Sequence, residues 1–441
     1  MTAVIGILNK KGVALAADSA VTRTRGFDNT KVTKNGNKMI RLSDVLPICV
    51  MLTGNGGFMR TQWDIIVRHY RQHRGTVMHA TVEACMHDFF RYIADHGLFR
   101  EPEYAKDRIK DELDSFFYNI EDQIEDKYKN RDKDDEIASP HAFHKAYVSK
   151  LNGWCKRWLK DGVCPQFQDY TQQVFQEYTK EIFDEFIEQH SYDQGDIFKN
   201  GMYPRQIMCE LREPLEKALM VRLTTRRGND RDMAELVFSG YGKQQEYPSL
   251  VSAVVCEGFD NRVNYHVRPT DIICISDERP TAICPFAQKD VIHSVLRGFH
   301  RNFSRHLSDD VKRSFTPMWN DIFFPCKEDN VNYMDFSEQL GEVKTDDLCR
   351  HFFRQMKRLL DRNFCQWEKA LEDYDLQSMA ALAESLVDLT GFHRILTFQQ
   401  ERVGGPVDVA VISKNDGFTW LNRKSWYHHK DVGGRYGKLG V

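Results

Sequence analysis

The 441-residue sequence has no apolar run long enough to cross a membrane, and its first residues lack the pattern of a signal peptide. With a formal net charge of -3, it also lacks the strongly basic balance of a general nucleic-acid binder. We therefore expect a cytoplasmic protein that binds neither membranes nor nucleic acid. At this length the chain has room for more than one hydrophobic core.

The 11 cysteines include no C-x-x-C pair, the spacing that zinc and redox sites commonly use. His69 and His73 lie one helical turn apart, but no further ligand spacing accompanies them. The glycine-rich segment 54–57 lacks the Lys and Ser or Thr of a phosphate-binding loop and is typical of a turn between a strand and a helix. The sequence therefore predicts no metal and no cofactor.

A threonine stands directly behind Met1. If Met1 is removed, Thr2 carries both a hydroxyl nucleophile and an amine that can act as its base. Two short apolar runs at 4–8 and 13–17 flank a turn and predict a hairpin that is buried on both faces. The second run ends at Asp18.

A lysine introduces the next predicted strand. Segment 38–42 alternates as a strand does, and 48–53 runs apolar into the glycine-rich turn. Thr2, Asp18 and Lys38 thus stand at the ends of consecutive predicted strands. Taken singly, Asp18 is typical of a turn and Lys38 of a solvated charge, so their combination carries the signal.

Segments at both ends of the chain carry a family resemblance. They are Thr2-Ala3-Val4-Ile5-Gly6-Ile7, Gly12-Val13-Ala14-Leu15-Ala16-Ala17-Asp18 with Val21-Thr22, Asn35-Gly36-Asn37-Lys38-Met39-Ile40, and Val403-Gly404-Gly405-Pro406-Val407-Asp408-Val409-Ala410-Val411-Ile412 with Asp416-Gly417-Phe418. The first three resemble the start of proteasome β-type subunits and of bacterial HslV-type proteases. The last is similar to the final hairpin of that family.

The resemblance implies an N-terminal nucleophile (Ntn) hydrolase of the α+β class, built as a four-layer αββα sandwich. A discontinuous hydrolase domain would comprise 1–99 and 234–441, with helices at 58–73 and 76–99 and an extra helical segment at about 304–373. The intervening segment, 100–233, is highly charged and has apolar residues at helical spacing, which predicts an inserted helical bundle. Asp260-Asn261 between two apolar runs predicts a further hairpin.

By position, the resemblance makes Thr2 the nucleophile, Asp18 its acidic partner and Lys38 the catalytic lysine. It assigns the oxyanion donor to the backbone N–H of Met51. The walls of the substrate pocket would include Val21, Cys49 and Thr53, and an apolar substrate side chain would suit them.

The family's additional serines have no counterpart in segments 282–288 and 399–403 of this chain. Within the second segment, Glu401 is the candidate for the family's additional acid. An equal alternative for Glu401 is a surface carboxylate paired with Arg402.

The function implied is that of a threonine-type peptidase, which cleaves peptide bonds through a Thr2 acyl-enzyme after Met1 is removed. Its partners would be a peptide or protein substrate, further copies of itself in a homo-oligomer, and an unfoldase or other protein bound through the helical insert. Two alternatives stay open: a catalytically silent structural or interaction subunit, and an Ntn amidohydrolase of small amides. The missing serines and the large inserts favour the silent subunit, whereas the combination of Thr2, Asp18 and Lys38 favours catalysis.

Overall fold

The computed structural model describes residues 2–25, 29–33, 36–99, 101–128, 140–160, 162–192, 203–225, 233–256, 258–298, 310, 313–314, 331–396 and 405–424. This part of the chain combines helices with antiparallel sheets, which confirms the mixed α and β class expected from the sequence. Within these residues, no helix has the length and apolar character needed to span a bilayer.

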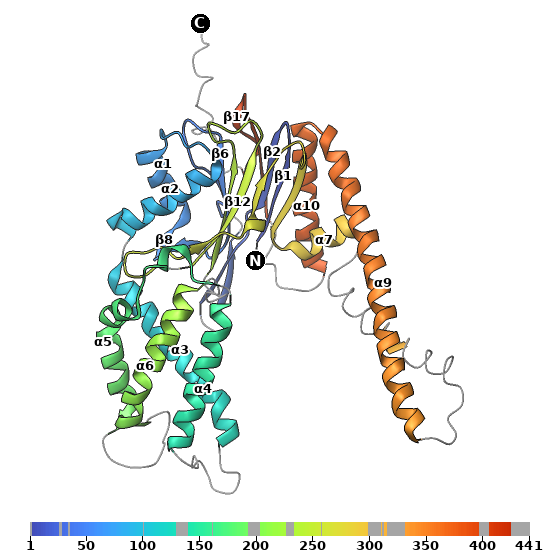
Figure 1. Ribbon diagram of the computed structural model, residues 1–441. Coiled ribbons are helices and arrows are strands. Elements are labelled where there is room, and N and C mark those ends of the chain that lie inside the picture. Colours follow the sequence, from blue (N-terminus) through green and yellow to red (C-terminus); the bar gives the residue numbers. More distant parts are fainter. Residues whose placement is uncertain are drawn as a thin grey trace.

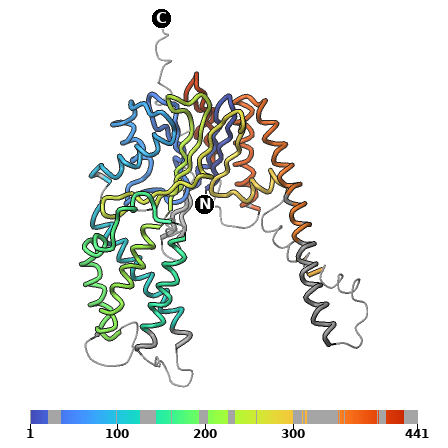
Figure 2. The backbone as a smooth tube through the Cα atoms, in the orientation of Figure 1, coloured from blue at the N-terminus to red at the C-terminus, as the bar shows by residue number. Residues whose placement is uncertain are grey.

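The first sheet has the strand order β15-β1-β2-β16-β17. Its strands are β15 (Thr281–Ala287), β1 (Ala3–Asn9), β2 (Gly12–Asp18), β16 (Val407–Ser413) and β17 (Gly417–Asn422). The predicted first hairpin is confirmed, because β1 pairs antiparallel with β2 and every residue of both strands is buried. Strand β2 from the start of the chain pairs with β16 from near its end, so the blue and red segments of Figure 2 belong to one sheet.

The second sheet has the order β13-β12-β11-β6-β5, with β14 also paired to β12. Its strands are β13 (Tyr265–His266), β12 (Ser249–Val255), β11 (Ala234–Gly240), β6 (Ile48–Gly54), β5 (Met39–Arg41) and β14 (Ile272–Cys274). The turn predicted at Asp260-Asn261 is confirmed, since both residues have positive φ and the flanking Phe259 and Arg262 pair with each other. Further two-stranded pairs are β3 (Val21–Arg25) with β4 (Asn29–Thr33), and β9 (Ser191–Tyr192) with β10 (Tyr203–Pro204).

The two sheets pack face to face, and helices cover their outer faces (Figure 1). Leu15 of the first sheet and Met51 of the second belong to the same core cluster between the sheets. The outer face of the first sheet packs against α7 (Lys289–Arg297), α9 (Val331–Asp373) and α10 (Leu376–Leu396). The outer face of the second sheet packs against α1 (Trp63–Arg74) and α2 (Val82–Asp95).

Apolar residues at helical spacing in segment 100–233 fall at 109–124, 143–158 and 175–187, and helices cover these three places; a fourth helix, at 205–224, had not been predicted. The helices are α3 (Pro102–Tyr128), α4 (Pro140–Leu159), α5 (Gln172–His190) and α6 (Arg205–Thr224). Their buried side chains form one continuous cluster with α2 and the second sheet. An example of the junction is the stack of Phe167 on Phe259, with ring centroids 4.9 Å apart. The helical segment is therefore packed on the sheet rather than attached by a linker alone.

The helix expected at 58–73 begins later than predicted. A small hairpin of β7 (Gly57–Phe58) and β8 (Thr61–Gln62) precedes α1, and its two turn residues, Met59 and Arg60, both have positive φ. Glycine or asparagine is usual in such a turn. Tertiary packing accounts for the exception, because Met59 is buried and the Arg60 guanidinium lies over the Tyr104 ring at 4.7 Å.

Candidate active site

The candidate site lies where β1 begins and β2 ends. Because Val4 pairs with Ala17, the antiparallel register brings Thr2 and Asp18 to the same end of the hairpin. The Asp18 Oδ1 accepts a hydrogen bond from the backbone N–H of Ala3 at 2.8 Å. Thr2 and Asp18 are 8% and 1% exposed. A buried carboxylate is therefore fixed to the main chain one residue after Thr2.

Lys38 reaches this carboxylate from the other sheet. It directly precedes β5, and its Nζ donates a hydrogen bond to the Asp18 Oδ1 at 2.7 Å. Burial lowers the pKa of Lys38 from its ordinary value, while the charge and hydrogen bond of Asp18 act in the opposite direction. The structure thus brings together the predicted acid and the predicted lysine, as an ion pair between the sheets beside the start of β1.

Met51 lies in the middle of β6, between β5 and β11. The N–H groups of a central strand point alternately to its two neighbours. Leu52 donates its N–H to the Lys38 carbonyl oxygen at 2.8 Å, on the β5 side. The N–H of Met51 therefore points to the opposite side, toward β11. Its side chain is fully buried between the sheets.

The predicted pocket residues differ in their surroundings. Thr53 follows Leu52 on β6 and is therefore close to Lys38, whereas Cys49 is fully buried in the core between the sheets, where burial raises the pKa of its thiol. Val21 belongs to β3, but its side chain lies outside the described residues, as does the whole of Glu401. Of the predicted pocket residues whose side chains are described, Thr53 is the one next in sequence to the backbone partner of Lys38.

The Glu235 carboxylate on β11 is the hydrogen-bond partner of Thr53. The Thr53 hydroxyl donates to the Glu235 Oε2 at 3.4 Å, and the Ser252 hydroxyl donates to the Glu235 Oε1 at 2.9 Å. The Lys289 Nζ lies 3.9 Å from the same carboxylate and comes from the start of α7, just beyond the strand that pairs with β1. The apolar pocket expected around Thr53 thus has a charged side.

A second buried ion pair lies next to the first, and the sequence did not predict it. Asp408 of β16 pairs with Ala17 of β2, and its carboxylate forms an ion pair with Lys424, which follows β17. Their side chains are 2% and 1% exposed. A carboxylate inside an apolar strand is the one sequence signal for this pair, because Lys424 belongs to a polar segment that resembles an ordinary surface turn.

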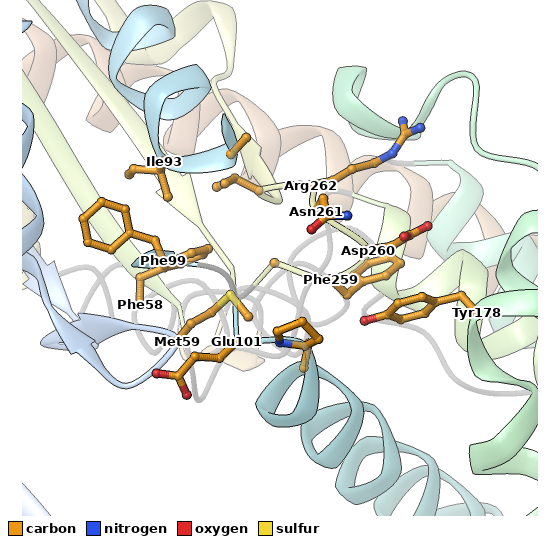
Figure 3. A pocket seen from close by; sticks show the side chains of 15 residues that line it. Phe58, Met59, Ile93, Phe99, Glu101, Tyr178, Phe259, Asp260, Asn261 and Arg262 are labelled. Carbon is orange, nitrogen blue, oxygen red and sulfur yellow. The ribbon is translucent and has the colours of Figure 1, made fainter. Parts of the chain in front are cut away.

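A cavity of about 80 Å³ lies apart from these residues, where the helical segment meets the second sheet (Figure 3). Apolar side chains such as Phe58, Phe99 and Phe259 line it, and the rim includes Glu101 and Arg262. None of its lining residues is a candidate catalytic residue. We therefore do not assign the predicted chemistry to this cavity.

No protein-family model and no curated protein matches the chain. Among the described residues, no group of three or more His, Cys, Asp or Glu side chains is arranged to hold a metal ion. The functional argument consequently depends on the geometry around Asp18 and Lys38.

Proposed function

We propose that the chain is an Ntn hydrolase of the proteasome β type, in which Thr2 becomes the first residue after Met1 is removed and cleaves peptide bonds. The observation that carries this proposal is the shared Asp18 carboxylate, which accepts both from the Lys38 Nζ at 2.7 Å and from the Ala3 N–H at 2.8 Å. An acid and a lysine from two sheets thereby meet beside the residue with the required nucleophile.

The charges of Lys38 and Asp18 favour an N-terminal amine that acts as a base. A cation close to an α-amine favours the neutral form of that amine, and only the neutral amine can accept the proton of the Thr2 hydroxyl. Asp18 favours the charged form of Lys38 and limits its orientations. Burial of the pair strengthens these effects, because little solvent screens them.

In the proposed reaction the α-amine of Thr2 takes the hydroxyl proton as the oxygen attacks the carbonyl carbon of the substrate. The C–N bond then breaks, and the leaving amine takes the proton. Water attacks the resulting ester on Thr2 with the same amine as base, which releases the acid and restores the hydroxyl. No oxidant, reductant or cofactor is needed for this balance.

The layered architecture supports the same proposal. Two stacked antiparallel sheets between helices are what a four-layer αββα Ntn hydrolase requires. The proposal includes assembly into a homo-oligomer, since Leu389, Phe392 and Leu396 form an exposed apolar stripe on α10. It also includes a partner surface on the helices of segment 100–233.

One observation favours the silent-subunit alternative. The Met51 N–H, which the resemblance assigns to the oxyanion, points toward β11 rather than toward β5. A protein with this backbone arrangement could keep the fold and the ion pair but lose turnover. Absence of hydrolysis by a correctly processed protein with a free Thr2 is the result that this alternative predicts.

Selective blocking of the N-terminal amine tests the proposal. Cyanate at about pH 7 carbamylates α-amines, with pKa about 8, in preference to ordinary lysines, with pKa about 10.4. We expect hydrolysis of acylated peptide amides to fall in proportion to the carbamylated fraction of Thr2. Peptide mapping measures that fraction and shows whether Lys38 has also reacted. Full activity with Thr2 completely blocked would contradict the proposal.

A further inference from the structure

The ammonium group of Lys424 has three acceptors, two of them buried and one partly buried. It donates to the Asp408 Oδ2, to the Gly36 carbonyl oxygen at 2.9 Å and to the Ser19 hydroxyl at 3.4 Å. An ammonium carries three N–H donors, so these acceptors can satisfy it completely. The backbone N–H of Lys424 also donates to the Asp408 Oδ1 at 3.0 Å. The segment after β17 is therefore anchored inside the molecule.

These acceptors belong to the segments that carry the candidate site. Ser19 directly follows Asp18, and Gly36 precedes Lys38 by two residues. Gly36 donates its N–H to the Ser19 carbonyl oxygen at 2.9 Å, so the two segments also contact each other. Asp408 lies across from Ala17, the residue before Asp18. Lys424 thus bonds to the residue after Asp18 through its hydroxyl and to the segment before Lys38 through its main chain.

We propose that Lys424 is a positioning residue for the threonine-dependent hydrolysis, an inference that rests on the function proposed above. By holding Gly36 and Ser19, Lys424 fixes the Lys38 ammonium against Asp18 and beside Thr2. It contacts none of the reacting atoms in this scheme. The site is then complete only after Lys424, two residues beyond β17, has reached its place, so catalysis depends on this residue as well.

The four charged groups also influence one another. The charged groups acting on Lys38 are Asp18, Asp408 and Lys424. Glu235, on β11 of the sheet that contains β5, pairs with Lys289 at the start of α7. The Lys424 charge lowers the pKa of Lys38, and the Asp408 charge raises it. Loss of Lys424 alone leaves the Asp408 carboxylate uncompensated, which favours protonated amines nearby. Loss of the Lys424 and Asp408 charges together removes most of this effect on the protonation of nearby amines.

The experiment compares Lys424→Met with the double variant Asp408→Asn/Lys424→Met. A buried ion pair that loses one partner destabilises the protein, whereas removal of both charges is far less costly. In the double variant, asparagine at 408 still offers an oxygen to the backbone N–H of residue 424. Lys414→Met is the matched control, because Lys414 lies on the β16–β17 hairpin and pairs with Glu246 at the surface.

The readouts are the saturating rate of adduct formation at Thr2 with a peptide epoxyketone, measured from about pH 5 to 9, and the midpoint of denaturant unfolding. For Lys424→Met we expect the rate of adduct formation to fall by at least about tenfold and the unfolding midpoint to fall as well. The acid limb of the pH–rate profile should shift to higher pH. The double variant should recover the unfolding midpoint and the pH profile but stay about tenfold slow, because Gly36 and Ser19 are no longer held. Lys414→Met should match the unmodified protein.

The outcomes separate this inference from the proposed function. A double variant that recovers both its stability and the full rate of adduct formation would show a purely structural pair and overturn the inference alone. If the unmodified protein, with Met1 removed, forms no adduct at Thr2, the proposed function fails and the inference fails with it.

Discussion

Replacing Thr2 by alanine is expected to abolish amide hydrolysis, with a loss of about 10³-fold or more. Alanine removes the hydroxyl that forms the acyl-enzyme and leaves the α-amine without a proton to accept. Alanine is small enough for Met1 to be removed, so the variant tests the hydroxyl and not the processing. The measurement is the initial rate of release of an amine from acylated peptide amides.

Thr2→Ser serves as the conservative variant and should keep measurable hydrolysis, because serine supplies the same nucleophile next to the same amine. Thr419→Ala, an exposed change on β17 of the same sheet, should leave the rate unchanged. A Thr2→Ala protein that hydrolyses the substrates as fast as the unmodified protein would exclude Thr2 as the nucleophile.

Replacing Lys38 by methionine is expected to have the second-largest effect. The Asp18 carboxylate loses its cation in a buried site, which should lower the free energy of unfolding by about 3–5 kcal/mol. Hydrolysis should fall by about 10² to 10⁴-fold, because the α-amine is no longer kept neutral beside a positioned cation. Denaturant unfolding and the initial rate of hydrolysis measure the two effects separately.

Two further variants separate stability from chemistry at Lys38. Asp18→Asn/Lys38→Met removes both charges and should regain much of the lost stability without regaining hydrolysis. Lys10→Met removes a lysine whose partner, Asp277, is largely exposed, and it should change neither property appreciably. Hydrolysis at the normal rate by the folded double variant would exclude a catalytic role for the pair.

The secondary structure was most predictable where local patterns and packing agree. The runs at 4–8 and 13–17 predict β1 and β2 because both faces of these strands are buried, and Asp260-Asn261 predicts its turn because both residue types tolerate positive φ. The β7–β8 hairpin was missed because its turn uses Met59 and Arg60. Their conformation depends on contacts with distant residues, which no local pattern records.

In the candidate site, too, some residues could be predicted from the sequence and others depend on the three-dimensional fold. Thr2, Asp18 and Lys38 could be selected because the resemblance covers their segments, and the structure then places Asp18 and Lys38 in contact. Lys424 could not be selected, because its burial depends on the fold of the chain after β17. The direction of the Met51 N–H depends on strand register, which a one-residue shift reverses.

The most direct test of the central claim is the intact mass of the purified protein before and after treatment with a peptide epoxyketone, which reacts with an N-terminal threonine through both its hydroxyl and its amine. The account predicts a mass without Met1 and the gain of a single inhibitor molecule, with no gain in Thr2→Ala. A protein that retains Met1, or one with a free Thr2 that gains no inhibitor, would contradict the account.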